Sequence, residues 1–154
     1  MDELVNTSAK THGPSPSPAL GTAPSAGWLE LRRDDFDAFF RVPFEQYGPD
    51  SHHVSPFRSD LAKMLDPGVN PTFRRAGDLT HFTALRNGSP VGRLTAQVHR
   101  GYNHRFSRRT GFFGFFDTSP DPVVARTLLD AAGGCLRRRG CTEMRGGVKF
   151  TPSQ

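Results

Sequence analysis

The chain has 154 residues, enough for one domain with a modest hydrophobic core. Twenty Lys and Arg residues against fifteen Asp and Glu residues give a net charge of +5. This balance permits binding to nucleic acid, an anionic membrane surface or a phosphorylated small molecule, without choosing among them. No apolar run reaches the roughly 18 residues of a membrane span, and residues 1–4 lack the pattern of a signal peptide. We therefore expect a cytoplasmic protein that does not bind membranes.

The segment from residue 6 to residue 26 differs in composition from the rest of the chain. It is rich in Ser, Pro, Thr, Gly and Ala and has almost no large apolar side chain. Such a segment cannot bury enough surface to offset the entropy lost on ordering. The sequence predicts a disordered tail over residues 1–26 and a single folded domain over residues 27–154.

The domain begins with a predicted strand followed by a helix. Residues 28–32 alternate weakly between apolar and polar side chains, which favours a short strand, and Asp34 or Asp35 can cap the next helix. Four phenylalanines recur at spacings of three and four, which is one helical face: Phe36, Phe39, Phe40 and Phe44. Pro43 is expected to kink or end this helix, because proline lacks the backbone N–H.

A second short helix is predicted over residues 57–65, and a β-hairpin follows. Residues 81–86 and 91–99 flank Asn87-Gly88, the strongest short hairpin signal in the chain. The second strand alternates, so its side chains divide between the two faces of the sheet. One set is Gly92, Leu94, Ala96 and Val98, and the other is Arg93, Thr95, Gln97 and His99.

The C-terminal third predicts a polar loop over residues 101–109, then a strand, a helix and a returning strand. Residues 112–116 are apolar on both faces, which favours a central strand. Asp121 can cap the helix that follows, with Gly140 ending it. A right-handed crossover lays the last strand, residues 142–148, parallel to the phenylalanine-rich one.

The ordered series of motifs resembles a family of double-length, poorly characterised bacterial GNAT (N-acetyltransferase-like) proteins. The segments that carry the resemblance are Asn70-Pro71-Thr72-Phe73, residues 87–94, Asn103-His104, residues 111–116, residues 136–140 and Arg145-Gly146. The resemblance covers only the N-terminal part of that family. It implies an α/β (α+β) fold: a mixed, mainly antiparallel sheet with flanking helices, incomplete at the C-terminus.

The resemblance also implies the acyl-CoA acyltransferase superfamily, with acetyl-CoA or another acyl-CoA as the cofactor and no metal. In such proteins the backbone at the end of the fourth strand lies beside the pantetheine arm. The matching residues here are Phe115, Phe116 and Asp117.

Two departures from the family's pattern bear on activity. The pyrophosphate loop of catalytic members, Arg/Gln-x-x-Gly-x-Gly/Ala, is replaced over residues 117–123 by a segment with no Gly, two prolines and two acids. The chain also ends shortly after the returning strand, like a truncated paralogue or gene fragment. We therefore expect no acyl transfer by this chain alone. The alternatives are a non-catalytic interaction module, a basic nucleic-acid-binding module and a fragment without function.

Other candidate sites each have an ordinary structural interpretation. His52-His53 could begin a metal site, but no ligand cluster follows and a polar loop is preferred. His99 or His104 could act as a base, although a position on a surface strand or loop is preferred. Cys135 and Cys141 are expected to be reduced packing residues, although Cys141 beside a basic helix end could have a lowered pKa.

Two arginine clusters could together bind RNA or phosphate, although arginines at helix ends are usually solvated. One cluster contains Arg100, Arg105, Arg108 and Arg109, with Tyr102 beside them, and the other is Arg137-Arg138-Arg139. An open sheet edge left by missing strands would invite self-association or pairing with a partner's strand.

Overall fold

The computed structural model of the protein describes residues 27–147. The predicted tail, residues 1–26, and residues 148–154 lie outside the described residues. The elements in chain order are β1 (Leu29–Arg33), α1 (Phe36–Tyr47), α2 (Arg58–Leu65), α3 (Pro71–Ala76), β2 (Gly77–Arg86), β3 (Ser89–His99), α4 (Arg100–Arg105), β4 (Thr110–Thr118), α5 (Pro122–Arg138) and β5 (Glu143–Arg145).

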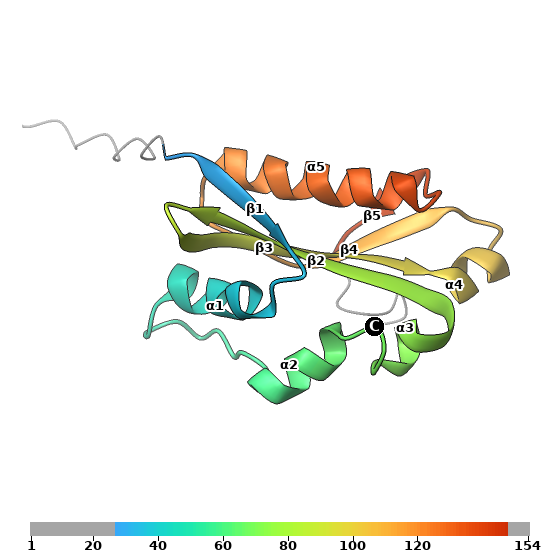
Figure 1. Ribbon diagram of the computed structural model, residues 1–154, viewed down its shortest axis with the longest axis horizontal. Helices are drawn as coiled ribbons and strands as arrows, with labels where there is room; N and C mark the ends of the chain where they lie inside the picture. Colours follow the sequence, from blue (N-terminus) through green and yellow to red (C-terminus); the bar gives the residue numbers. More distant parts are fainter. Residues whose placement is uncertain (1–26, 148–154) are drawn as a thin grey trace, which may run out of the picture.

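The described strands form one sheet in the order β1-β2-β3-β4-β5. The pairs β1–β2, β2–β3 and β3–β4 are antiparallel, and β5 pairs in parallel with the start of β4. Helix α5 covers one face of the sheet, and α1, α2 and α3 lie on the other (Figure 1). The predicted fold class and the parallel pairing of the returning strand with the phenylalanine-rich one are confirmed. The predicted internal position of residues 112–116 holds only at Phe112, because β5 does not extend along the rest of this segment.

Helix α5 is held against the sheet by glycines that let it approach closely. A Cβ at Gly92 would lie 2.7 Å from Val124 Cγ1, and one at Gly111 would lie 2.6 Å from Leu136 Cδ1. The helix begins at the predicted cap, where the Asp121 side chain accepts a hydrogen bond from the Val123 N–H. The core under this helix is formed by Phe82, Ala84, Leu94, Ala96, Val98, Val124, Leu128, Ala132, Cys135, Leu136 and Cys141.

The opposite face of the sheet is buried as well, and it carries polar side chains. Gln97 Nε2 donates to Thr95 Oγ1 at 2.9 Å, and His99 Nε2 lies 3.2 Å from Gln97 Oε1. The preferred surface position of His99 is therefore wrong, since the residue is 6% exposed and packs against Phe73 and Phe112. The alternation predicts two faces correctly, but helices cover both of them. His104 is exposed, as expected.

Helix α1 does not end at Pro43, one of the two outcomes expected there, but continues to Tyr47. A proline at this position removes the N–H that would bind the carbonyl four residues earlier, which is that of Phe39. The guanidinium of Arg93 supplies a replacement, with Nη1 donating to the Phe39 carbonyl at 3.2 Å. A side chain from β3 thus binds the helix carbonyl that Pro43 leaves without its usual partner.

Other boundaries differ from the predicted ones in the segments with weak periodicity. Part of the predicted polar loop 101–109 is helix α4, and Asn70 caps the short helix α3, which was not predicted. Strand β2 begins at Gly77, four residues before the predicted start. The predicted hairpin is confirmed, with Asn87 and Gly88 both at positive φ in the turn between β2 and β3.

Two further expectations concern the membrane and the thiols. No helix in the described part of the chain is long and apolar enough to span a bilayer. Cys135 and Cys141 are buried free thiols, which agrees with packing roles. Burial raises the pKa of Cys141, so the alternative of a lowered pKa is wrong.

The two buried histidines make stability depend on pH. Burial lowers the pKa of His81 and of His99, so the folded state holds both rings neutral where the unfolded chain takes up protons. Their contribution to the free energy of unfolding is present above about pH 6.5, the pKa of histidine in the unfolded chain, and is lost as the pH falls below that value. We expect the urea concentration at the unfolding midpoint to decrease as the pH is lowered from about 7.5 to about 5.5.

Two sets of variants test this dependence in urea unfolding at several pH values. Replacing His81 and His99 by glutamine should flatten the slope of midpoint against pH, whereas replacing the exposed His104 by glutamine should leave it unchanged. A midpoint that rises on acidification would contradict the assignment.

Candidate functional site

A β-bulge near the end of β4 disturbs the sheet at the residues that the sequence resemblance points to. Thr95 lies opposite Gly114 and Arg93 opposite Asp117, so β4 uses one more residue than β3 between the two pairs. Phe115 has a φ of 47°, in the left-handed region that a bulky side chain seldom adopts. A bulge leaves its extra residue outside the hydrogen-bonded ladder, and bulges are common beside active sites.

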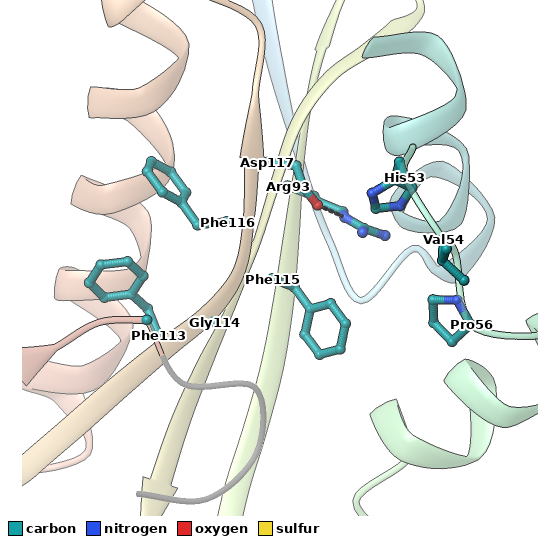
Figure 2. A pocket seen from close by; sticks show the side chains of 10 residues that line it. His53, Val54, Pro56, Arg93, Phe113, Gly114, Phe115, Phe116 and Asp117 are labelled. Atoms are coloured by element: carbon teal, nitrogen blue, oxygen red, sulfur yellow. Dashed lines mark hydrogen bonds and ion pairs between the residues drawn. The ribbon is translucent and has the colours of Figure 1, made fainter. Parts of the chain in front are cut away.

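The bulge also reverses the expected alternation of side chains. Phe113 and Phe116 lie on one side of β4, with ring centroids 5.7 Å apart, and Phe115 points to the other side (Figure 2). Strand β5 pairs only with residues 110–112 of β4. Within the described residues, no strand pairs with the bulged half of β4 on that edge.

A cavity of about 440 Å³ lies at this bulge. Its walls come from β4, from Arg93 on β3 and from the loop between α1 and α2 (Figure 2). The lining residues are His53, Val54, Pro56, Arg93, Phe113, Gly114, Phe115, Phe116, Asp117 and Gly147. Most of these present apolar or backbone surface, which suits a flexible, weakly polar chain.

Both oxygens of the Asp117 carboxylate at this cavity are already bonded. Arg93 Nε donates to Oδ2 at 2.7 Å, and the Tyr47 hydroxyl donates to Oδ1 at 2.7 Å. The bond to Asp117 raises the pKa of Tyr47. Arg93 is 2% exposed and lies over the rings of Phe39 and Phe115, at 4.9 and 5.6 Å from their centroids. Asp117 therefore anchors the end of β4 rather than offering a free base.

An imidazole does reach the cavity, from the loop after α1. The ring of His53 stacks on Tyr47 with centroids 4.9 Å apart, and its side chain faces the cavity in Figure 2. Imidazole is the side chain that most often serves as a general base in enzymes. The sequence placed His53 in a polar loop, which is correct. Its contact with the cavity depends on a fold in which α1 brings Tyr47 to Asp117.

The start of α5 does not fit a bound diphosphate. Pro122 has no N–H, the Val123 N–H binds the Asp121 side chain, and the next two N–H groups bind the Asp121 carbonyl. The carboxylate of Asp121 occupies the place of an anion and pairs with Arg86 at 2.6 Å. The departure noted in the sequence thus corresponds to a helix terminus whose donors are already used.

The structure places Phe115, Phe116 and Asp117 together at one cavity, with Phe116 40% exposed. Their contact with a ligand stays a prediction. The described residues contain no cluster of three or more His, Cys, Asp or Glu side chains that could hold a metal ion. Sequence reasoning did not single out Arg93 or Tyr47 as site residues. The signal that could have identified Arg93 was its position as a charged residue within an otherwise buried strand.

Comparison of sequences finds two curated relatives. The chain is 31% identical over 128 residues to a bacterial ceramide synthase of Caulobacter vibrioides, and 29% identical over 127 residues to protein YghO of Escherichia coli. These alignments cover 82% and 80% of the chain but only 32% and 31% of the relatives, so the chain spans about a third of their length. No protein-family model matches the chain.

Comparison of structures finds acetyltransferases. An acetyltransferase of Trypanosoma brucei matches with a TM-score of 0.55 at 19% identity, over 79% of this chain and 83% of that one. The aminoglycoside N-acetyltransferase AAC(6')-Iy in complex with CoA matches with a TM-score of 0.54 at 16% identity, over 86% and 83%. At these identities the matches establish the arrangement of helices and strands.

Proposed function

Because the chain has the fold of the GNAT N-acetyltransferases, we propose that its bulge cavity receives the thioester arm of an acyl-CoA for acyl transfer to an amine. The observation that carries this proposal is the bulge at Phe115, which opens β4 beside a largely apolar cavity. The cavity's size and lining suit a pantetheine chain.

Each group at the cavity has a part in this proposal. Acyl transfer forms a bond between the amine nitrogen and the acyl carbon, breaks the carbon–sulfur bond to release CoA as a thiolate that solvent can protonate, and requires the amine to lose a proton. His53 is the imidazole at the cavity and would accept that proton. The backbone of the bulge lines the cavity and would bind the acyl carbonyl. Arg93 and Tyr47 hold Asp117, and thereby fix the strand end against which the thioester would lie.

The nature of the acceptor and the strength of donor binding follow from two further observations. A ceramide is an amide, so the name of one relative supports an amine as the acceptor. The start of α5 offers no free donor to a diphosphate, so the nucleotide part of acyl-CoA should add little affinity. We expect S-acetylpantetheine to bind within about threefold of acetyl-CoA, a difference of less than about 1 kcal/mol.

Calorimetric titration with acetyl-CoA tests the proposal directly. Val54 lines the cavity and is 89% exposed, so replacing it by tryptophan should narrow the cavity without disturbing the core. Val54→Trp should weaken acetyl-CoA binding by about tenfold, a loss of about 1.4 kcal/mol. Val69→Trp is the matched control, because Val69 is 52% exposed and does not line this cavity.

An acylation assay with amine acceptors then separates binding from transfer, and it tests the sequence-based expectation that this chain alone transfers no acyl group. His53→Gln should lower the acylation rate by 10²–10⁴-fold while acetyl-CoA affinity changes little, the range typical of a general base. Absence of heat from a folded chain, or equal weakening by Val54→Trp and Val69→Trp, would overturn the assignment of the cavity.

A further inference from the structure

A second cavity lies at the other end of the sheet and is lined by arginines. It has a volume of about 470 Å³ and is formed where β2 starts, β3 ends, β4 starts and α5 ends, beside α4. Figure 1 shows these segments together at the end of the sheet away from α1. Its lining residues are Asp78, Val98, Arg100, Asn103, Arg108, Arg109, Arg139, Gly140 and Cys141. The fold thus brings three arginines of one sequence cluster, Arg100, Arg108 and Arg109, to the same cavity as Arg139 of the other.

Most of the positive charge in this arginine cavity is not balanced by acids. Arg100 pairs with Asp78 at 2.8 Å, which accounts for the acidic residue of the lining. Within the described part of the chain, Arg108, Arg109 and Arg139 form no ion pair.

Glu143, at the start of β5, is the other carboxylate that interacts with this cluster. Arg108 lies near enough to Glu143 to contribute to the lowering of the Glu143 pKa. The main cause of that lowering is its hydrogen bond from Thr110, and Arg145 binds its other oxygen at 3.3 Å. Glu143 is therefore already engaged by groups outside the cavity lining.

Arg139 shows that this is more than a solvated patch of charge. Its Nη2 donates to Thr80 Oγ1 at 2.6 Å, whereas its Nη1 is buried and has no hydrogen-bond partner among the described residues. A buried donor without an acceptor costs about 1–3 kcal/mol, and more when it is charged. Arg139 also lines the cavity, so its guanidinium is placed to meet a bound anion.

We propose that the arginine cavity binds the phosphate or diphosphate group of a small phosphorylated molecule. Guanidinium groups present paired N–H donors that match phosphate oxygens, and three unbalanced arginines complement a group of two or three negative charges. The site is separate from the bulge cavity, because the two cavities share no lining residue. Along the chain into β4 their nearest lining residues are Arg109 and Phe113, which at about 3.3 Å per residue are roughly 13 Å apart.

The geometry favours a compact phosphorylated ligand over nucleic acid. Single-stranded nucleic acid needs a groove that follows its backbone and aromatic rings that are free to stack on bases. Here the guanidiniums line one cavity, and the ring of Tyr102 packs against Phe106 and Phe112 at 4.8 and 5.2 Å.

Titration calorimetry with sodium pyrophosphate, compared with orthophosphate, tests the site. Arg108→Gln with Arg109→Gln should weaken pyrophosphate binding by at least about tenfold, since both side chains are exposed and bind the ligand directly. Arg41→Gln with Arg126→Gln removes the same charge from exposed positions outside the cavity and should change affinity less than about twofold. Arg139→Lys keeps the charge but removes the planar guanidinium that can bind two phosphate oxygens at once, so it should weaken binding by about fivefold or more.

Several outcomes would overturn the proposal. These are no pyrophosphate binding up to millimolar concentration by a chain that circular dichroism shows to be folded, equal weakening by both double variants, and unchanged affinity in Arg139→Lys. Tighter binding of a single-stranded oligonucleotide, with equal losses in both double variants, would instead indicate a diffuse nucleic-acid surface. Val54→Trp should not alter pyrophosphate binding, which keeps this test independent of the acyl-donor proposal.

Discussion

Replacing Arg93 by methionine is expected to lower the free energy of unfolding by about 3–5 kcal/mol, the usual cost of removing one partner of a buried ion pair. The guanidinium is 2% exposed and serves two acceptors at once, the Asp117 carboxylate and the Phe39 carbonyl. Methionine fills much of the same volume but leaves both acceptors without this donor. Urea unfolding followed by circular dichroism measures the loss.

A double-mutant cycle with Pro43→Ala isolates the bond to the helix carbonyl. Alanine restores an N–H that can reach the Phe39 carbonyl, so Arg93→Met should cost about 1 kcal/mol less in that background. Arg41→Met on the exposed face of α1 is the matched control and should change stability by no more than about 0.5 kcal/mol. Strict additivity of Arg93→Met and Pro43→Ala would contradict the shared carbonyl.

Replacing Gly92 by valine is expected to destabilise the protein by about 1–3 kcal/mol through overpacking. Its Cβ would lie 2.7 Å from Val124 Cγ1, 2.9 Å from Leu128 Cδ1 and 3.3 Å from the Asp117 carbonyl oxygen. Helix α5 would have to move away from the sheet at the end that carries the bulge. Thermal unfolding measures the loss.

Gly101→Ala provides the control for a glycine without close neighbours. A Cβ there meets nothing within 4 Å, and the residue lies in α4, so alanine should stabilise the protein by up to about 1 kcal/mol. If Gly92→Val were as stable as the wild type, the close contact between α5 and β3 would be refuted.

The sequence predicts those elements whose local signals agree with the tertiary structure. Helix α5 has a cap at Asp121 and a regular apolar stripe, and the hairpin at Asn87-Gly88 has a turn sequence that determines its geometry. Helices α3 and α4 were missed because each has six residues, too few to show an apolar period. The sequence could not predict that α1 continues past Pro43, because the donor that binds the Phe39 carbonyl in place of the missing N–H is Arg93 on β3, far away in the sequence.

The candidate site was predicted only in part, and for a related reason. Resemblance directed attention to Phe115, Phe116 and Asp117, and the structure places all three at one cavity. The bulge depends on register with β3, which no local pattern reveals. His53 reaches the cavity from the loop after α1, where it stacks on Tyr47, and the path of that loop is set by tertiary packing.

The replacement of a helix bond by Arg93 constrains how the sequence can drift. If a residue with a backbone N–H replaces Pro43, that N–H can bind the Phe39 carbonyl. The Arg93 guanidinium is then no longer needed as the donor to this carbonyl. Loss of arginine at position 93 should therefore be tolerated mainly after loss of proline at position 43. The two positions are expected to covary among homologous sequences, although they lie on different elements and are fifty residues apart.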